Sequence, residues 1–134
     1  ADLESFWSGR PKAYLAVSMP GFPNLFMLNG PNGPVGNFSL IDIAEHQWVY
    51  IEQLLARLRD GDCEQLAPTR EAMDAFETER IAAAKQTVWF RGGCVSWYLD
   101  DQGVPSSWPW NYSRFVEKMS RPDWAAFAVD APDP

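Results

Sequence analysis

The residues of this chain whose types and spacing could bind a ligand lie in a glycine-rich turn. Gly30, Gly33 and Gly36 are three residues apart, and Pro31 and Pro34 stand between them. Proline fixes the backbone angle φ and glycine permits positive φ, so this turn can be both sharply bent and stiff. A helical pattern begins directly after it. A glycine-rich turn followed directly by the start of a helix therefore predicts backbone N–H groups that face a ligand of anionic character.

The spacing of the three glycines leaves a second interpretation open. The pattern is G-x-x-G-x-x-G, which differs from the G-x-G-x-x-G of a first dinucleotide-binding turn. Short glycine patterns are weak signals, so a tight strand-to-helix connection that binds nothing fits the same residues.

Composition argues against several other kinds of function. The chain has 134 residues, a net charge of −7 and no basic stripe, so it is a poor candidate for binding nucleic acid or an anionic membrane. His46 is the only histidine, and Cys63 and Cys94 do not have the spacing of metal ligands. We therefore expect no metal site, and we expect His46 to be a hydrogen-bonded structural residue.

The sequence also favours a particular location for the protein. No apolar run is long enough to span a membrane, and no secretory signal is visible at the start of the chain. Cys63 and Cys94 then read as reduced, buried thiols, which are typical of the cytosol. We expect a cytoplasmic protein without a membrane partner.

Helical periodicity and capping residues predict four helices. The longest begins near Asn37 or Ser39, repeats apolar residues every three or four positions as far as Leu58, and ends before Gly61. A second helix runs from Thr69 to about Gln86. Shorter helices are expected around residues 3–7 and from Asn111 to Met119.

The remaining chain reads as short strands, turns and loops. Four strands are predicted, at residues 13–18, 24–28, 87–90 and 95–99. A turn is expected at residues 100–103, and the two prolines within residues 104–110 make that segment an aromatic loop. The acidic, proline-containing residues 121–134 are expected to form an extended tail, frayed at its end.

Several of these segments together resemble a known family. They are Tyr14–Val17, Gly21–Leu28, Gly30–Asn32, Glu45–Gln47, Cys94–Asp100, Gly103 and Trp108–Pro109. In this order and at these separations they resemble the C-terminal part of flavin-dependent Baeyer–Villiger monooxygenases, within the flavin-containing monooxygenase superfamily. The resemblance covers most of residues 13–118.

The resemblance implies an α/β fold, the C-terminal portion of a Rossmann-like FAD-binding domain with few short strands, two long helices, an aromatic loop and a short C-terminal helix. The whole of residues 1–134 would be one incomplete part of that domain. Complete enzymes of the family bind FAD and NADPH and insert one oxygen of O2 beside a ketone carbonyl, or oxygenate a soft heteroatom. Their dinucleotide fingerprints and catalytic arginine lie upstream of the matching segment, so no catalytic residue is expected in this chain.

The resemblance also assigns candidate site residues. The expected cofactor-binding residues are Gly33, Pro34, Val35, Gly36, Asn37, Phe38, Ser39 and Trp97. The expected substrate-pocket residues are Gly36, Asn37, Phe38 and Leu40. Trp97 would correspond to the tryptophan that contacts the nicotinamide cofactor, although a core tryptophan of a strand pair fits the same pattern. Some family members continue with Gly-Ala-Asn and a lysine, whereas Tyr98–Asp101 follow here, so NADPH contacts beyond Trp97 are not carried over.

Three functions follow as hypotheses. The first is the C-terminal part of an FAD- and NADPH-dependent monooxygenase that is inactive alone, needs the missing N-terminal part as its partner and self-associates through exposed apolar area. The second is a non-enzymatic α+β module that grips a ligand or protein with the aromatic loop at residues 97–110. The third is a subunit that completes a split flavoenzyme.

Overall fold

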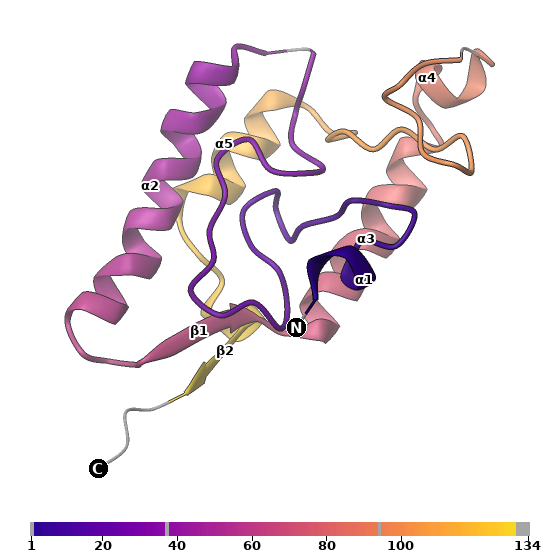
Figure 1. The fold of residues 1–134 in the computed structure, drawn as a ribbon. Helices are drawn as coiled ribbons and strands as arrows, with labels where there is room; N and C mark the ends of the chain where they lie inside the picture. Colours follow the sequence, from indigo (N-terminus) through magenta and orange to yellow (C-terminus); the bar gives the residue numbers. More distant parts are fainter. Residues whose placement is uncertain (1, 37, 94, 131–134) are drawn as a thin grey trace.

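The computed structural model describes residues 2–36, 38–93 and 95–130. Its elements are α1 (Leu3–Phe6), α2 (Leu40–Arg59), β1 (Gln65–Pro68), α3 (Arg70–Ala84), α4 (Val88–Arg91), α5 (Tyr112–Ser120), a 3-10 helix η1 (Trp124–Ala126) and β2 (Phe127–Asp130). In Figure 1, α2 and α3 lie on opposite sides of the molecule, and the irregular chain between α1 and α2 occupies the space between them.

The long helix α2 forms where the periodicity predicts it. The Ser39 hydroxyl accepts a hydrogen bond from the Asp42 amide, so Ser39 is its N-cap, as expected. At the other end Gly61 adopts a φ of +78°, a conformation that glycine reaches without strain. The buried side of α2 consists of Ile43, Gln47, Tyr50, Ile51 and Leu54.

Helices α3 and α5 also begin at their capping residues. The Thr69 hydroxyl accepts from the Ala72 amide at 3.1 Å and begins α3. The Asn111 side chain accepts from the Arg114 amide at 2.9 Å and begins α5. These bonds satisfy N–H groups that have no partner within their own helix. The predicted helices are therefore confirmed, with ends displaced by one or two residues.

The small sheet was not predicted from the sequence. β1 and β2 pair antiparallel, with Gln65 opposite Asp130 and Pro68 opposite Phe127. Leu66 and Phe127 are buried in the core, and this burial holds both strands in place. The prediction of an extended tail is wrong for residues 121–130, which form η1 and β2; residues 131–134 lie outside the described part.

None of the four predicted strands forms. Residues 13–18 make a tight loop closed by a bridge between Tyr14 and Ser18, with Leu15 and Ala16 at positive φ. Residues 24–28 have no strand partner in the described part of the chain, and residues 87–90 lie largely in α4. Residues 95–99 are irregular apart from a bridge between Leu99 and Pro105. Apolar runs predicted strands here, but a strand also needs a neighbour to pair with.

The core lies where the helices meet the irregular chain. Buried side chains from α2, α3, α5 and both strands pack there with Tyr14, Leu15 and Val17. Trp108 is part of this core: only 2% of it is exposed, and its ring packs edge-on against Phe115. The loop at residues 104–110 is therefore anchored in the core.

Candidate functional site

The glycine-rich turn and the aromatic loop, by which we mean residues 97–110, face each other across one hollow. It has a volume of about 540 Å³ and lies between residues 29–35, residues 97–101, residues 106–107 and the chain after α1. We call it the turn hollow. Both of its long walls are irregular backbone, so its shape depends on the side chains that hold these two segments together.

Gly30 and Asn32 hold the turn in place. A Cβ atom at Gly30 would lie 2.3 Å from the Ala16 carbonyl oxygen, so only glycine allows this approach. The buried Asn32 side chain accepts from the Ala13 amide at 3.0 Å and donates to the Ser106 carbonyl at 2.8 Å. One amide group thus joins the turn to the N-terminal segment and to the opposite loop.

Two aromatic rings form the opposite wall. The Trp97 and Tyr98 rings are stacked, with 3.9 Å between their centroids and 25° between their planes. Trp97 is 80% exposed and offers its indole ring to the hollow and the solvent. An exposed aromatic face of this kind suits a flat ligand ring. The alternative interpretation of Trp97 as a core tryptophan is wrong.

A smaller pocket of about 70 Å³ opens beside the hollow. Its lining includes Val35, Gly36, Trp89 and Tyr98. Gly36 has a φ of +89°, and a Cβ atom there would come within 3.1 Å of the Tyr98 hydroxyl oxygen. Gly36 therefore permits both the local backbone conformation and the approach of Tyr98. Sequence reasoning gave no site role to Trp89, which belongs to no recognisable motif, or to Tyr98, although Tyr98 lies within the family-like segment Cys94–Asp100.

The structure brings together some of the expected cofactor-binding residues. Gly33, Val35 and Trp97 line the turn hollow, and Gly36 joins Val35 at the smaller pocket. Pro34 is fully buried and lines neither space. Asn37 lies outside the described residues.

The other expected site residues lie around the start of α2. Phe38 packs on Tyr112, with 4.8 Å between the ring centroids, and Ser39 caps the helix. Leu40 is half exposed and lines a different, shallow hollow on the outside of α2. Among the described residues, the expected substrate-pocket residues Gly36, Phe38 and Leu40 do not line one common space.

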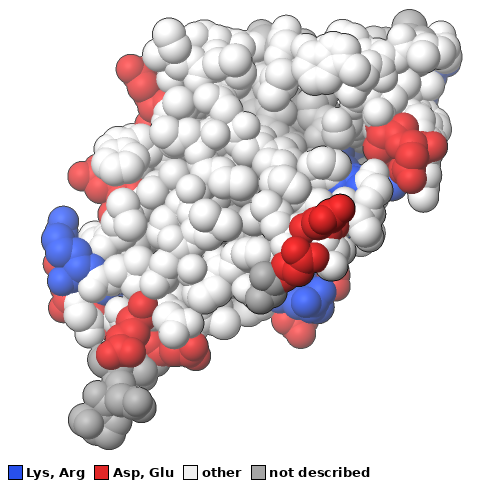
Figure 2. All heavy atoms as spheres, in the orientation of Figure 1, with Lys and Arg blue, Asp and Glu red and all other residues white. Residues whose placement is uncertain are grey.

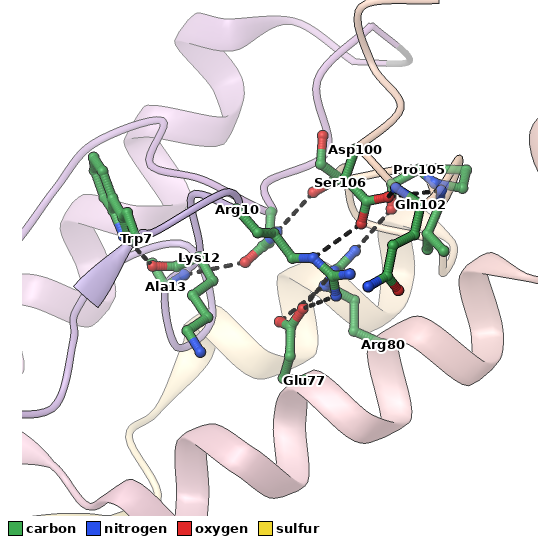
Figure 3. A network of polar contacts seen from close by, with 12 residues as sticks. Trp7, Arg10, Lys12, Ala13, Glu77, Arg80, Asp100, Gln102, Pro105 and Ser106 are labelled. Carbon is green, nitrogen blue, oxygen red and sulfur yellow. Dashed lines mark hydrogen bonds and ion pairs between the residues drawn. The ribbon is translucent and has the colours of Figure 1, made fainter. Parts of the chain in front are cut away.

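The one cation in the described lining of the turn hollow is already paired. This cation is Arg10, and the Arg10 Nε atom lies 3.0 Å from the Asp100 carboxylate. Behind them, Glu77 and the fully buried Arg80 extend the network (Figure 3). The only sequence signal for these residues is the i, i+3 spacing of Glu77 and Arg80 on the predicted helix.

His46 and Cys63 take no part in this site. His46 Nε2 lies 3.9 Å from the Asp42 carboxylate, and its ring packs edge-on against Tyr112. Cys63 is a buried free thiol, and Cys94 is outside the described residues. Within the described residues no cluster of metal ligands occurs.

No helix in the described part of the chain has the length and apolarity needed to cross a membrane. The cytoplasmic location expected from the sequence stays a prediction.

Comparison with known proteins gives a consistent class. No protein-family model matches the chain. It is 43% identical over 107 residues to an uncharacterised monooxygenase of Mycobacterium tuberculosis, a match that covers 80% of this chain and 21% of that protein. It is 34% identical over 134 residues to a Baeyer–Villiger monooxygenase of Streptomyces coelicolor, covering 98% of this chain and 26% of that protein.

A solved structure shows the same fold. Oxidised steroid monooxygenase bound to NADP matches with a TM-score of 0.82 and 23% identity, covering 97% of this chain and 25% of the other. The helices and small sheet described above therefore form part of a flavin monooxygenase fold. The chain is related to the Baeyer–Villiger monooxygenases, which confirms the resemblance noted from its sequence. It spans 21% to 26% of the length of these curated relatives.

Proposed function

We propose that residues 1–134 are the C-terminal part of the FAD-binding domain of a Baeyer–Villiger-type monooxygenase. The observation that carries this proposal is the similarity of nearly the whole chain to about a quarter of an enzyme of that name. The remaining three quarters would supply the diphosphate-binding turns and the catalytic arginine. On this proposal the chain is inactive alone.

The reaction of the complete enzyme would be the insertion of one oxygen atom of O2 between a ketone's carbonyl carbon and its neighbouring carbon. The other oxygen atom leaves as water: NADPH supplies two electrons and one hydrogen as a hydride, and a proton from solvent supplies the other hydrogen. Bound FAD supplies the chemistry that reduces O2. Oxygenation of a soft heteroatom follows the same balance.

The described residues fit the ring side of such a cofactor site. The turn hollow offers the close backbone of Gly30 and Gly33 on one wall and the Trp97 ring on the other. Flat rings of flavin or nicotinamide suit these surfaces, whereas a diphosphate needs free cations or N–H groups. Arg10 is already paired with Asp100. We therefore assign the ring-side wall to this chain and the diphosphate site to the missing part.

The proposal keeps the expected site residues in their roles, except for Pro34. Gly33, Val35–Ser39 and Trp97 would contact the cofactors, and Gly36, Asn37, Phe38 and Leu40 would line the substrate pocket; the buried Pro34 would act only by fixing the backbone of the turn. Gly36, Phe38 and Leu40 lie apart on the surface, which is consistent with a pocket whose other walls belong to the missing part.

An exposed apolar surface on α2 supports the proposal that a further part of the enzyme packs against this chain. Leu40, Ile41, Ala44 and Trp48 line a shallow hollow of about 440 Å³ on α2, and we call these four residues the α2 outer face. Ile41 is 74% exposed and Trp48 51%. In the orientation of Figure 1, charged side chains gather mainly at the edges of the molecule and leave most of the face uncharged (Figure 2). We propose that the missing part of the enzyme covers the α2 outer face.

The test compares the complete gene product with the 134-residue chain. We expect the complete protein to carry a flavin absorbance band and to convert a ketone to its ester while it oxidises NADPH. We expect the chain alone to be colourless and inactive. A flavin band in the chain alone, with no second polypeptide on a gel, would contradict the proposal, as would a complete protein without flavin.

The alternative of a self-contained binding module makes a different prediction. It requires the isolated chain to be a compact monomer. The structure restricts how such a module could bind, because Trp108 is buried in the core and Trp97 is the exposed tryptophan of the loop. Analytical ultracentrifugation of the chain separates this alternative from the incomplete domain, which we expect to self-associate.

A further inference from the structure

Four charged side chains from three segments meet at one wall of the turn hollow, two of them lining it and two lying behind it (Figure 3). Arg10 follows α1, Glu77 and Arg80 lie on α3, and Asp100 lies in the aromatic loop. The Arg80 guanidinium donates to Glu77 Oε1 at 2.6 Å and Oε2 at 3.2 Å, and to the Pro105 carbonyl at 2.8 Å. Arg10 Nε lies 3.0 Å from Asp100 Oδ2, and its Nη1 lies 3.7 Å from Glu77 Oε1.

This network is buried and neutral. The Arg80 side chain is 0% exposed and the Asp100 side chain 3%, with Glu77 at 12% and Arg10 at 18%. Two positive and two negative charges balance. Buried charges are costly unless they are paired, so the four groups favour the arrangement in which each faces an opposite charge, even though Asp100 Oδ2 accepts no hydrogen bond. The network therefore fixes the aromatic loop relative to α3.

Hydrogen bonds connect the charged network to the segment that forms one wall of the turn hollow. The second oxygen of Asp100 accepts from the Gln102 and Val104 amides, both at 2.9 Å, and so shapes the turn after Leu99. The Ser106 amide and hydroxyl both donate to the Tyr98 carbonyl, at 2.8 and 2.9 Å. The segment that carries Tyr98 is thus held from both sides by groups that the network positions.

The orientation of the Trp97 ring depends on Tyr98. Among the described contacts of its side chain, stacking on Tyr98 is the one that orients the indole ring, which is otherwise 80% exposed. A shift of the loop would therefore move Tyr98 and with it Trp97. Glu77 and Arg80 do not line the turn hollow, so they can affect a ligand there only through the loop.

We propose that Arg10, Glu77, Arg80 and Asp100 form a positioning network that sets Trp97 at the nicotinamide nucleotide of the complete enzyme. This inference rests on the proposed function, because it takes NADP as the ligand that meets Trp97. Glu77 and Arg80 are positioning residues: they act on the nucleotide through the loop and do not touch it.

The test measures the dissociation constant of NADP⁺ for the flavin-loaded complete enzyme by calorimetry. Glu77→Gln keeps the shape of the side chain and removes its charge, and we expect it to weaken NADP⁺ binding by about tenfold. Glu79→Gln is the matched control: Glu79 lies on the same helix and pairs with Arg114 at the surface, away from the hollow. We expect it to leave NADP⁺ binding unchanged.

Repeating the measurement in a Trp97→Ala enzyme shows whether the loss of NADP⁺ binding acts through Trp97. In a Trp97→Ala enzyme, Glu77→Gln should cause no further loss, because the ring that the network positions is gone. Equal losses in both backgrounds, or no loss in either, would overturn the inference. Flavin content and thermal stability identify a variant that fails to fold, and Arg80→Lys, at a residue that also does not line the turn hollow, then replaces Glu77→Gln in the same cycle. A wild-type complete protein that binds no flavin would overturn the proposed function, and this inference with it.

Discussion

Gly30→Ala is the sharpest test of how the turn is built. The added Cβ atom would lie 2.3 Å from the Ala16 carbonyl oxygen and 3.2 Å from the Met27 Cβ atom, whereas ordinary contacts begin at 3.4 Å. The nearest obstacle is backbone, and Ala16 is buried with a φ of +62°, so it cannot rotate out of the way. The turn or the loop at residues 13–18 must move as a whole.

The size of the effect follows from two opposing contributions. Overpacking against a rigid neighbour costs about 1–3 kcal/mol, occasionally more. Alanine also restricts the unfolded chain, which returns about 0.4–1 kcal/mol. We expect Gly30→Ala to lower the free energy of unfolding by about 2 kcal/mol, which corresponds to a decrease of roughly 8 °C in Tm for a chain of this size.

Gly33→Ala is the control in the same turn. Its Cβ atom would lie 3.3 Å from the Gly30 carbonyl oxygen and 3.5 Å from the Ala16 Cβ atom, so small adjustments relieve it. We expect a change within about 0.5 kcal/mol. Urea unfolding followed by far-ultraviolet circular dichroism measures both variants. If they unfold at the same urea concentration, the close approach at Gly30 does not limit the turn and the reasoning is refuted.

Three further predictions address a cap, the apolar surface and alkaline pH. Thr69→Ala removes the acceptor of the Ala72 amide and should lower the free energy of unfolding by about 1 kcal/mol in urea titrations; no change would mean that this cap is dispensable. Ile41→Lys with Trp48→Lys should make the isolated chain more monodisperse in ultracentrifugation and should prevent its association with a separately expressed upstream part. Unchanged association would remove the α2 outer face from that interface. Burial, together with the Asp123 carboxylate, raises the pKa of Tyr14 to about 12 from its ordinary value of 10.0, so the neutral phenol stabilises the fold below pH 10 and this contribution is lost between pH 10 and 12. Tyr14→Phe should flatten that alkaline loss of stability, and an identical pH profile for both proteins would contradict the assignment.

The sequence by itself determined helices α1, α2, α3 and α5, whereas α4 was predicted as a strand. Capping side chains and apolar periodicity act within a few residues, so Ser39, Thr69 and Asn111 locate the starts of α2, α3 and α5 without reference to the rest of the chain. It also determined the position of the glycine-rich turn, because glycine and proline restrict the backbone locally. The ordered set of family-like segments was enough to indicate the relationship to monooxygenases.

Only the tertiary structure decided the strands and the walls of the site. β1 and β2 are separated by about sixty residues, and no local sequence pattern predicts that Gln65 pairs with Asp130. The apolar run at residues 25–28 predicted a strand, yet strand formation depends on a pairing partner, and no strand in the described chain pairs with it. The turn hollow arises in the same way, because Asn32 reaches Ser106 across 74 positions and Arg10 meets Asp100 across 90. Long-range contacts of this kind depend on how the chain folds back on itself, which single-sequence patterns do not contain.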